Sequence, residues 1–308
     1  MTKKVGKNQK IMKRVCILFI LFLVAFNTSF AQQVLKKGFL VACGDDKLFI
    51  IDPNKSNDNH TEIIWKWAVS DAKSLPASYI PLLKSLDECK AVMGNKKILV
   101  TSFTGATILV DIASKDVEFY AKTPMAHSVD LLPNNRIVVA NSTHPKGNSI
   151  ELYDLNKNEK VLFTDSLYSG HGVAWNPKYK LLYVLGYQHL KTYSLVNWYS
   201  ENPSLKLESS WQLPDKSGHD LFRIDGDTFL ISTHHSVFLF NNNNKSFTDF
   251  TLLNGKNDIK SVNYYPKKNS LIYTVAEESW WTKNIYMVNP NKTIKLPGLK
   301  LYKVRKAI

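Results

Sequence analysis

Short apolar segments recur along the chain, with equivalent positions separated by about 37 to 48 residues. Each unit consists of an apolar segment, a turn, a second apolar segment, a polar loop, a third segment, a turn rich in Asn, Asp and Lys, and a fourth segment. Five units begin at Lys90-Ala-Val, His127-Ser-Val, His171-Gly-Val, His219-Asp-Leu and Lys260-Ser-Val. Periods in this range are typical of propellers and solenoids, and four short strands with alternating apolar residues make one propeller blade. The repeat therefore predicts an all-β fold, a β-propeller.

The two ends of the repeat decide the number of blades. The first unit starts directly at Gly38-Phe-Leu-Val and lacks a first strand, whereas residues 301–307 resemble the first strand of the other units. We therefore expect six blades, with the C-terminal strand joining the N-terminal blade as its innermost strand. This closure removes the free sheet edge that would otherwise invite aggregation. Seven blades would require a further unit within the irregular insertion at residues 70–86.

The N-terminal segment predicts export. Basic residues at positions 3–14 precede an apolar run from Val15 to Phe26, which ends in Ser29-Phe30-Ala31. This is the pattern of a signal peptide. We expect residues 1–31 to be removed near Ala31, leaving residues 32–308 as a single propeller domain in the periplasm or outside the cell. No segment approaches the roughly 18 apolar residues of a membrane helix, so we expect no membrane span.

Charge and cysteine content narrow the class of partner. Part of the formal charge of +14 lies in the signal segment, and the remaining lysines are scattered through turns such as Pro53-Asn54-Lys55. This pattern is typical of a solvated surface and argues against nucleic acid, whereas an anionic ligand fits the sign of the charge. Only Cys43 and Cys89 remain after residue 31, so we expect two buried thiols rather than a disulfide framework. We also expect a monomer.

The two ends of the central channel are predicted to differ. At the near face lie the starts of the first strands and the loops between the second and third strands. At the far face lie the other turns, where we expect only turn formers such as Asn, Asp, Pro, Gly and Lys. Seven of the eight histidines fall at near-face positions, which are His127, His144, His171, His189, His219, His234 and His235. Together with Lys90 and Lys260 they predict a His/Lys-lined channel mouth, which is the kind of concave, titratable surface that functional sites use.

Imidazoles from successive blades suit a divalent transition metal such as manganese. The candidate ligands are His171, His219, His235 and Glu277. A structural alternative is a ring of hydrogen-bonded histidines, since a Gly-His pair has that role in some propellers. The sequence Gly-His at positions 170–171 and 218–219 resembles such pairs. However, these histidines lie only two residues before the apolar centre of the strand, and this register favours a ligand-binding role.

The same mouth suits an acidic oligosaccharide. Tyr187, Trp280, Trp281 and Glu278 are candidate substrate-binding residues, because sugar rings stack on aromatic faces. His127, Lys260 and Lys90 are candidate catalytic residues for β-elimination, in which a metal or Lys neutralises a uronate carboxylate and a base removes the adjacent proton. We therefore expect a carbohydrate-active propeller, with a metal-assisted saccharide lyase as its enzymatic form. The alternative is a non-catalytic propeller that binds a glycan or a protein partner, with the tryptophans packing between blades.

Several of these segments carry a family resemblance. The stretches starting at His127-Ser-Val-Asp, Gly218-His-Asp-Leu, Thr233-His-His and Ala276-Glu-Glu-Ser-Trp-Trp resemble a family of secreted Bacteroidetes propellers of unknown function. This resemblance covers nearly all of residues 32–308 and implies a fold and an exported location, without an activity. More distantly, the mouth is similar to that of oligogalacturonate lyases, propellers that hold manganese through several His and a Gln. That likeness concerns the fold and assigns no ligand position by position.

Overall fold

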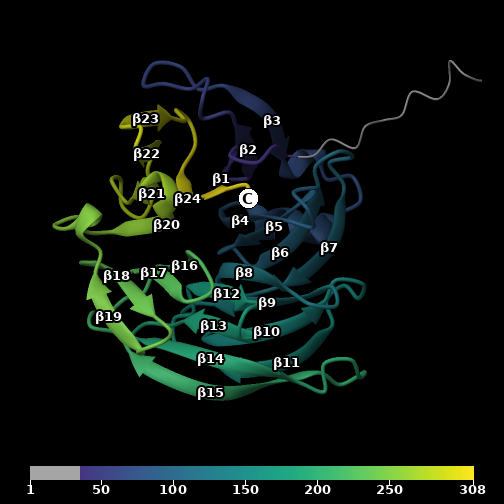
Figure 1. Ribbon diagram of the computed structural model, residues 1–308. Helices are drawn as coiled ribbons and strands as arrows, with labels where there is room; N and C mark the ends of the chain where they lie inside the picture. The colour runs from purple at the N-terminus through teal and green to yellow at the C-terminus, as the bar shows by residue number, and fades with distance from the viewer. Residues whose placement is uncertain (1–34) are drawn as a thin grey trace, which may run out of the picture. The chain divides into compact units, whose positions relative to one another are not determined.

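Residues 35–308, which are the residues that the computed structural model describes, form six four-stranded antiparallel sheets around a central channel (Figure 1). The prediction of a six-bladed β-propeller is confirmed. The innermost strands, in blade order, are β24 (Leu301–Lys306), β4 (Leu86–Val92), β8 (Ala126–Leu132), β12 (Gly172–Asn176), β16 (Asp220–Arg223) and β20 (Ile259–Tyr265). The second strands are β1 (Leu40–Gly44), β5 (Lys97–Ser102), β9 (Arg136–Asn141), β13 (Leu181–Leu185), β17 (Thr228–Ser232) and β21 (Ser270–Val275).

The remaining strands complete each blade toward the rim. The third strands are β2 (Lys47–Ile51), β6 (Ala106–Asp111), β10 (Ser149–Asp154), β14 (His189–Val196), β18 (Val237–Asn241) and β22 (Asn284–Val288). The outer strands are β3 (Ile63–Ala68), β7 (Val117–Lys122), β11 (Val161–Ser166), β15 (Ser204–Gln212), β19 (Ser246–Asp249) and β23 (Lys292–Lys295). The outer strand β7 alternates buried and exposed residues, as expected where one face packs on a neighbouring blade and the other meets water.

Blade 1 closes the ring as predicted, because β1 pairs with β2 on one side and with β24 on the other. The two strands approach so closely that Gly44 is required. A Cβ atom at Gly44 would lie 2.2 Å from the backbone oxygen of Lys300. In Figure 1 the C-terminus accordingly lies at the centre of the ring, where β24 ends.

The insertion at residues 70–86 does not hold a seventh blade. It contains two 3₁₀ segments, η1 (Val69–Asp71) and η2 (Ala77–Leu83), which cover the apolar layer between blades 1 and 2. Tyr79 is buried against the edge of Tyr120, with ring centroids 4.8 Å apart, and its hydroxyl donates a hydrogen bond to Glu159. Two further 3₁₀ segments, η3 (Thr251–Leu253) and η4 (Pro266–Lys268), complete the helical content of residues 35–308.

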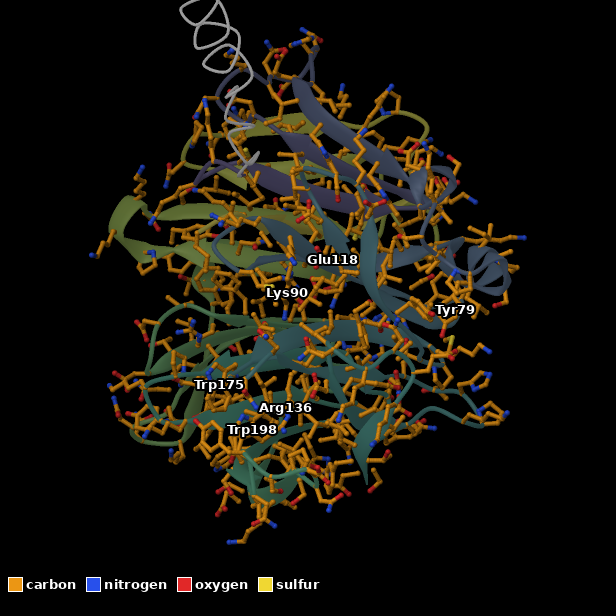
Figure 2. All side chains as sticks on the ribbon, turned by 90° about the vertical axis from the view of Figure 1, so that its right-hand side faces the viewer. Tyr79, Lys90, Glu118, Arg136, Trp175 and Trp198 are labelled. Carbon is orange, nitrogen blue, oxygen red and sulfur yellow. The ribbon has the colours of Figure 1, made fainter. Side chains whose placement is uncertain are left out.

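Apolar layers between neighbouring blades form the core, and buried polar contacts fix how the blades meet. Blades 3 and 4 are joined by Trp198, whose Nε1 donates to the Pro133 oxygen at 3.1 Å and whose ring lies 4.8 Å from the Arg136 guanidinium. Figure 2 shows Trp198 and Trp175 on the opposite side of the disc from Tyr79. Cys43 and Cys89 are both buried and both free, as expected.

Two predictions depend on the N-terminal part of the chain. The predicted signal peptide, residues 1–31, lies outside the described residues. Within residues 35–308, no helix has the length and apolar character that crossing a membrane requires.

Candidate functional site

Bulges in the inner strands build the near-face mouth of the channel. In β8, Ala126 and Ser128 pair with consecutive residues of β9, so His127 between them has no cross-strand partner. Lys260 in β20 is skipped in the same way. β4 and β24 contain bulges at the equivalent place. A bulge re-aims the extra side chain, and the six blades together form a mouth ring, defined as Asp87, His127, His171, His219, Lys260 and Tyr302.

The mouth ring differs from the predicted one in blade 2, where Lys90 was expected. β4 begins at Leu86, so Asp87 takes the ring position and Lys90 lies three residues further along the strand. The Lys90 Nζ donates to the Val173 oxygen at 2.6 Å, and Lys90 lines the far-face mouth of the channel. The irregular insertion hides this register in the sequence, because no turn signal marks where the strand begins.

A network of buried charges fills the channel below the ring. Arg305 forms ion pairs with both Glu88 and Asp220, at 2.6 and 2.5 Å. Lys303 lies 3.3 Å from Asp220, and its Nζ also donates to the backbone oxygens of His127 and His171. Burial opposes ionisation of Glu88, but the charges of Arg305 and Lys303 outweigh burial and lower the pKa of Glu88. We call Glu88, Asp220, Lys303 and Arg305 the channel network.

One side of the mouth ring pairs a carboxyl group with an imidazole. Asp87 contacts Nδ1 of His127. Burial raises the pKa of Asp87, whereas burial and the nearby charges of Lys303 and Lys260 lower the pKa of His127 to about 3. Both shifts disfavour the charged forms, so the carboxyl group and the imidazole meet as neutral groups. His127 also stacks on His171, with ring centroids 4.4 Å apart.

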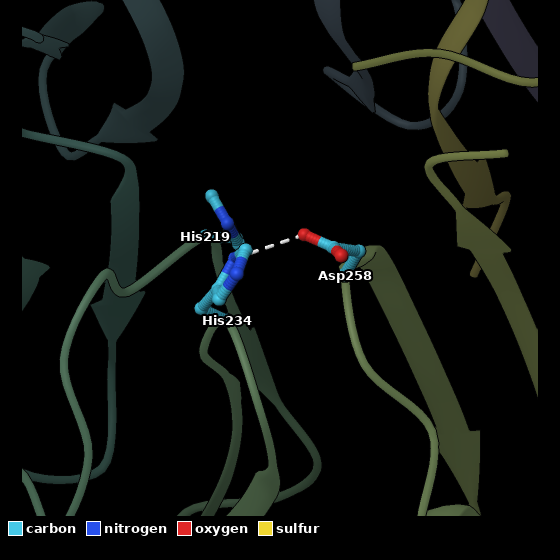
Figure 3. Close-up of side chains that lie close together, drawn as sticks. All are labelled: His219, His234 and Asp258. Carbon is cyan, nitrogen blue, oxygen red and sulfur yellow. Dashed lines mark ion pairs between the residues drawn. The ribbon is translucent and has the colours of Figure 1, made fainter. Parts of the chain in front are cut away.

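The opposite side of the ring gathers potential metal ligands (Figure 3). His234 Nδ1 lies 2.9 Å from an Asp258 carboxylate oxygen, and ligand atoms of His219, His234 and Asp258 all lie within 4.8 Å of one another. Two imidazoles and a carboxylate are donors that suit manganese or zinc. However, the Lys260 Nζ lies 2.9 Å from His219 Nε2 and 3.4 Å from Asp258. The residues therefore fit a divalent metal when the Lys260 ammonium leaves His219.

Of the predicted ligand set, only His219 belongs to this cluster. His171 Nδ1 is 2.9 Å from the Ser169 oxygen and thus has a backbone partner. His235 points to Asp215 and is exposed, while Glu277 accepts hydrogen bonds from Thr282 and neighbouring residues of its own loop. The pattern Thr-His-His could have suggested His234 as readily as His235. Asp258, just before β20, carries no sequence signal of its own.

Aromatic rings from two blades cover the mouth ring. Trp280 meets Phe103 edge-to-face with centroids 5.3 Å apart. Of the mouth ring, Tyr302 lies next to Trp280 and His127 lies next to Phe103. Trp280 thus lies at the predicted mouth. Trp281 instead lies between the ammonium groups of Lys283 and Lys300, and Glu278 pairs with Lys283 at 2.9 Å.

Two open grooves cross the near face beside the mouth. The larger one, about 650 Å³, lies between blades 3 and 4, and we call it the near-face groove. It is lined by Tyr168, Tyr187, Gln188, His189, Lys191 and Asn148 among others. A second groove of about 450 Å³ lies between blades 2 and 3 and contains Phe103, His144, Lys122 and Lys146. The sequence predicted Tyr187 but missed Tyr168, which follows an outer strand and has no near-face motif.

Comparisons with known proteins agree with this fold. The sequence pattern of a family described as a family of unknown function (DUF6528) matches residues 25–308. Among solved structures, a protein of unknown function from Bacteroides caccae is similar, with a TM-score of 0.58 and 12% sequence identity, over 87% of this chain and 98% of that chain. At this identity the similarity concerns the fold alone. No curated protein matches the sequence.

Proposed function

Since the chain belongs to DUF6528, a family of unknown function, its role has to be inferred from its own surface, and we propose that it binds an acidic saccharide on the near face. The observation that carries this proposal is the exposed Tyr168. Its side chain is 61% exposed and meets Tyr187 edge-to-face, with centroids 5.5 Å apart, inside the near-face groove. A large aromatic ring held in an open groove offers a face on which a sugar ring can stack.

The polar residues of the groove favour a saccharide over an apolar ligand. Asn148, Gln188 and His189 lie beside the two tyrosines and supply hydrogen-bond donors and acceptors. Lys191 supplies a cation, and its Nζ is held near the groove by the Ser166 oxygen at 3.2 Å. Two lysines line the neighbouring groove as well. Ammonium groups favour a carboxylate on the ligand, which a uronic acid carries.

The predicted location supports the same ligand class. Export to the periplasm or the cell exterior, through the signal peptide predicted at residues 1–31, would bring the protein to polysaccharides and their fragments. We propose that the exported chain acts there as a monomer, with binding confined to the near face.

A metal-assisted lyase is the second candidate, and the mouth ring favours it. A divalent metal bound by His219, His234 and Asp258 would neutralise the uronate carboxylate. Neutral His127, whose Nδ1 contacts Asp87, would accept at Nε2 the proton next to that carboxylate, and the neighbouring C–O bond would break as the double bond forms. Lys260 would donate the proton to the leaving oxygen. Lys90 takes no part, because it lies at the other end of the channel. Phe103 and Trp280 would have to separate to admit the sugar.

Calorimetric titration with galacturonate oligosaccharides tests the binding proposal. Tyr168→Ala should weaken binding about tenfold, since an aromatic stacking contact is lost. Tyr199→Ala is the matched control, because Tyr199 is 86% exposed and lies in the far-face turn between β14 and β15. Equal affinities for the two variants, or no binding by the wild-type protein, would contradict the proposal and favour a protein partner.

The lyase candidate has its own measurement. Ultraviolet absorbance of unsaturated uronates should rise when the wild-type protein is incubated with oligogalacturonate and manganese, and His127→Gln and His234→Ala should abolish the rise. Binding without any such absorbance would reject the lyase and leave the binding proposal intact.

A further inference from the structure

The far face contains a cationic pocket that the sequence did not predict. A cavity of about 540 Å³ lies where blades 5, 6 and 1 meet, and we call it the far-face pocket. Its cations are Lys37, Lys267, Lys268 and Lys306, and Tyr265 forms part of its wall. Lys37 precedes β1, Lys267 and Lys268 lie in η4, and Lys306 ends β24, so segments far apart in the sequence supply them. We expected only turn formers on the far face, but its turns also supply cations to a pocket.

The positive charge of the pocket is not balanced by acidic side chains. None of the ion pairs within residues 35–308 includes Lys37, Lys267, Lys268 or Lys306. Among residues 35–308, Asp225 is the only carboxylate side chain in the lining of the far-face pocket, and its oxygen already accepts the backbone N–H groups of Asp227 and Thr228. Lysines gathered in this way repel one another unless an anion lies between them.

Lys306 shows the effect of this repulsion. Its Nζ lies 4.4 Å from the centre of the Tyr265 ring, and Lys306 forms no ion pair within residues 35–308. Burial and the neighbouring charge of Lys268 lower the pKa of Lys306. An anion in the pocket would offset the effect of the Lys268 charge on the pKa of Lys306.

A buried hydroxyl group points to a ligand independently of the charges. The Tyr265 hydroxyl is buried and has no hydrogen-bond partner within residues 35–308. A buried polar group without a partner is unfavourable, and such groups are uncommon in folded proteins. The hydroxyl is closed off from the pocket, so a ligand oxygen would accept this hydrogen bond after a shift of the Tyr265 side chain toward it.

The pocket also has an apolar side. Ile224, Pro266, Ala307 and Ile308 line it together with the Tyr265 ring. The adjoining far-face mouth of the channel shares Lys306 and Ile308 with it and adds Arg223. A small inorganic ion would leave this apolar wall uncovered. An anion carried on an apolar or ring-shaped body would use both sides.

We propose that the far-face pocket binds a small soluble molecule that carries a sulfate, sulfonate or phosphate group on an apolar or aromatic body. The oxyanion meets the lysines and the Tyr265 hydroxyl, while the body covers the apolar wall. This site is separate from the near-face groove and does not depend on saccharide binding there.

A fluorescence titration with anilinonaphthalene sulfonate tests the site, because this probe combines a sulfonate with aromatic rings. The double variant Lys267→Gln/Lys268→Gln should bind it about tenfold more weakly, since two charge-assisted contacts are lost. The matched control, Lys157→Gln/Lys160→Gln, removes two exposed lysines from another far-face turn and should bind the probe like the wild-type protein. Phenylnaphthylamine, which lacks the sulfonate, should not distinguish the variants. Equal probe affinity for both double variants would overturn the proposal.

Tyr265→Phe provides a second test, because it should affect thermal stability and sulfonate binding differently. Removing the unpartnered hydroxyl should leave the thermal midpoint of the free protein unchanged or higher. The same change should weaken sulfonate binding several-fold, because the ligand loses a donor. A variant that binds the probe as tightly as the wild-type protein would show that the hydroxyl does not face the ligand, and would also overturn the proposed site.

Discussion

The Lys260 Nζ lies 2.9 Å from Nε2 of His219. An ammonium group has no acceptor capacity, so His219 must present a lone pair at Nε2 and carry its proton on Nδ1. That Nδ1 is buried and has no hydrogen-bond partner within the part of the chain that the structure describes. A metal ion at the cluster of His219, His234 and Asp258 would need the same Nε2 lone pair. Lys260 and a divalent metal therefore compete for one position.

Removal of Lys260 should strengthen metal binding. In Lys260→Met the Nε2 lone pair of His219 is free and a nearby positive charge is gone, so Mn²⁺ and Zn²⁺ should bind at least about tenfold more tightly than to the wild-type protein. Calorimetric titration measures this. His235→Ala, in a neighbouring residue that faces Asp215, should leave metal affinity unchanged. Weaker metal binding by Lys260→Met would show that the lysine supports the site instead of competing with the metal.

The channel network should make Arg305 important for stability. Arg305→Met leaves Glu88 and Asp220 buried without their closest partner, with Lys303 near both and Lys90 3.9 Å from Glu88. Loss of one partner of a buried ion pair lowers the free energy of unfolding by about 3–5 kcal/mol. Urea unfolding compares this variant with Arg223→Met, whose arginine has no ion pair within residues 35–308 and should change stability by less than about 0.5 kcal/mol. Similar losses in the two variants would argue against the network.

Acid should destabilise the protein through the buried imidazoles. Burial lowers the pKa of His171 in the folded protein well below the value of about 6.5 expected in the unfolded chain. Below that pH the His171 imidazole binds a proton in the unfolded chain but stays neutral in the folded protein, so stability falls as the pH falls. The raised pKa of Asp87 has the opposite effect on stability as the pH falls. Because Asp87 is present in both the wild-type protein and His171→Gln, this effect cancels when the two are compared. Between pH 6 and 5 this variant should lose about 1 kcal/mol less than the wild-type protein. Parallel pH profiles from urea unfolding would contradict the assignment.

The sequence predicted the fold because propeller blades repeat locally. The spacing of the apolar segments and the missing first strand at Gly38 were sufficient for six blades and their closure, since each blade forms from consecutive strands. The mouth ring was predicted where the repeat is regular, at His127, His171, His219 and Lys260. In blade 2 the insertion before β4 replaces the usual turn. The sequence therefore placed the ring position at Lys90, three residues beyond Asp87, which occupies it in the structure.

The rest of the site depends on loop geometry that a linear pattern does not encode. His234 and His235 are adjacent, and only the backbone of their loop decides which one faces Asp258 and which one faces Asp215. Tyr168 becomes part of a groove because the connection into blade 4 passes beside the Tyr187 loop. The far-face pocket combines the ends of three blades, and none of its lysines has an unusual sequence context.

Closure by β24 should be essential for folding. Deletion of residues 301–308 removes the innermost strand of blade 1 together with Lys303 and Arg305, and leaves the edge of β1 unpaired. We expect this variant to aggregate or to lack a cooperative thermal transition. Deletion of Ile308 alone, a residue that is 71% exposed, should retain the transition. A cooperative transition in the longer deletion would refute closure as the basis of stability.

Acidic-saccharide binding at the near-face groove is most directly tested by titrating the wild-type protein with two sugars that differ only at C6, which is a carboxylate in one and a hydroxymethyl group in the other. Galacturonate oligosaccharides should bind, and galactose oligosaccharides of the same length and linkage should bind at least about tenfold more weakly, because the contact of the carboxylate with Lys191 is lost. Lys191→Met should remove this preference while leaving affinity for the neutral sugar unchanged. Equal affinity of the wild-type protein for the two sugars, or no binding of either, would contradict the central claim.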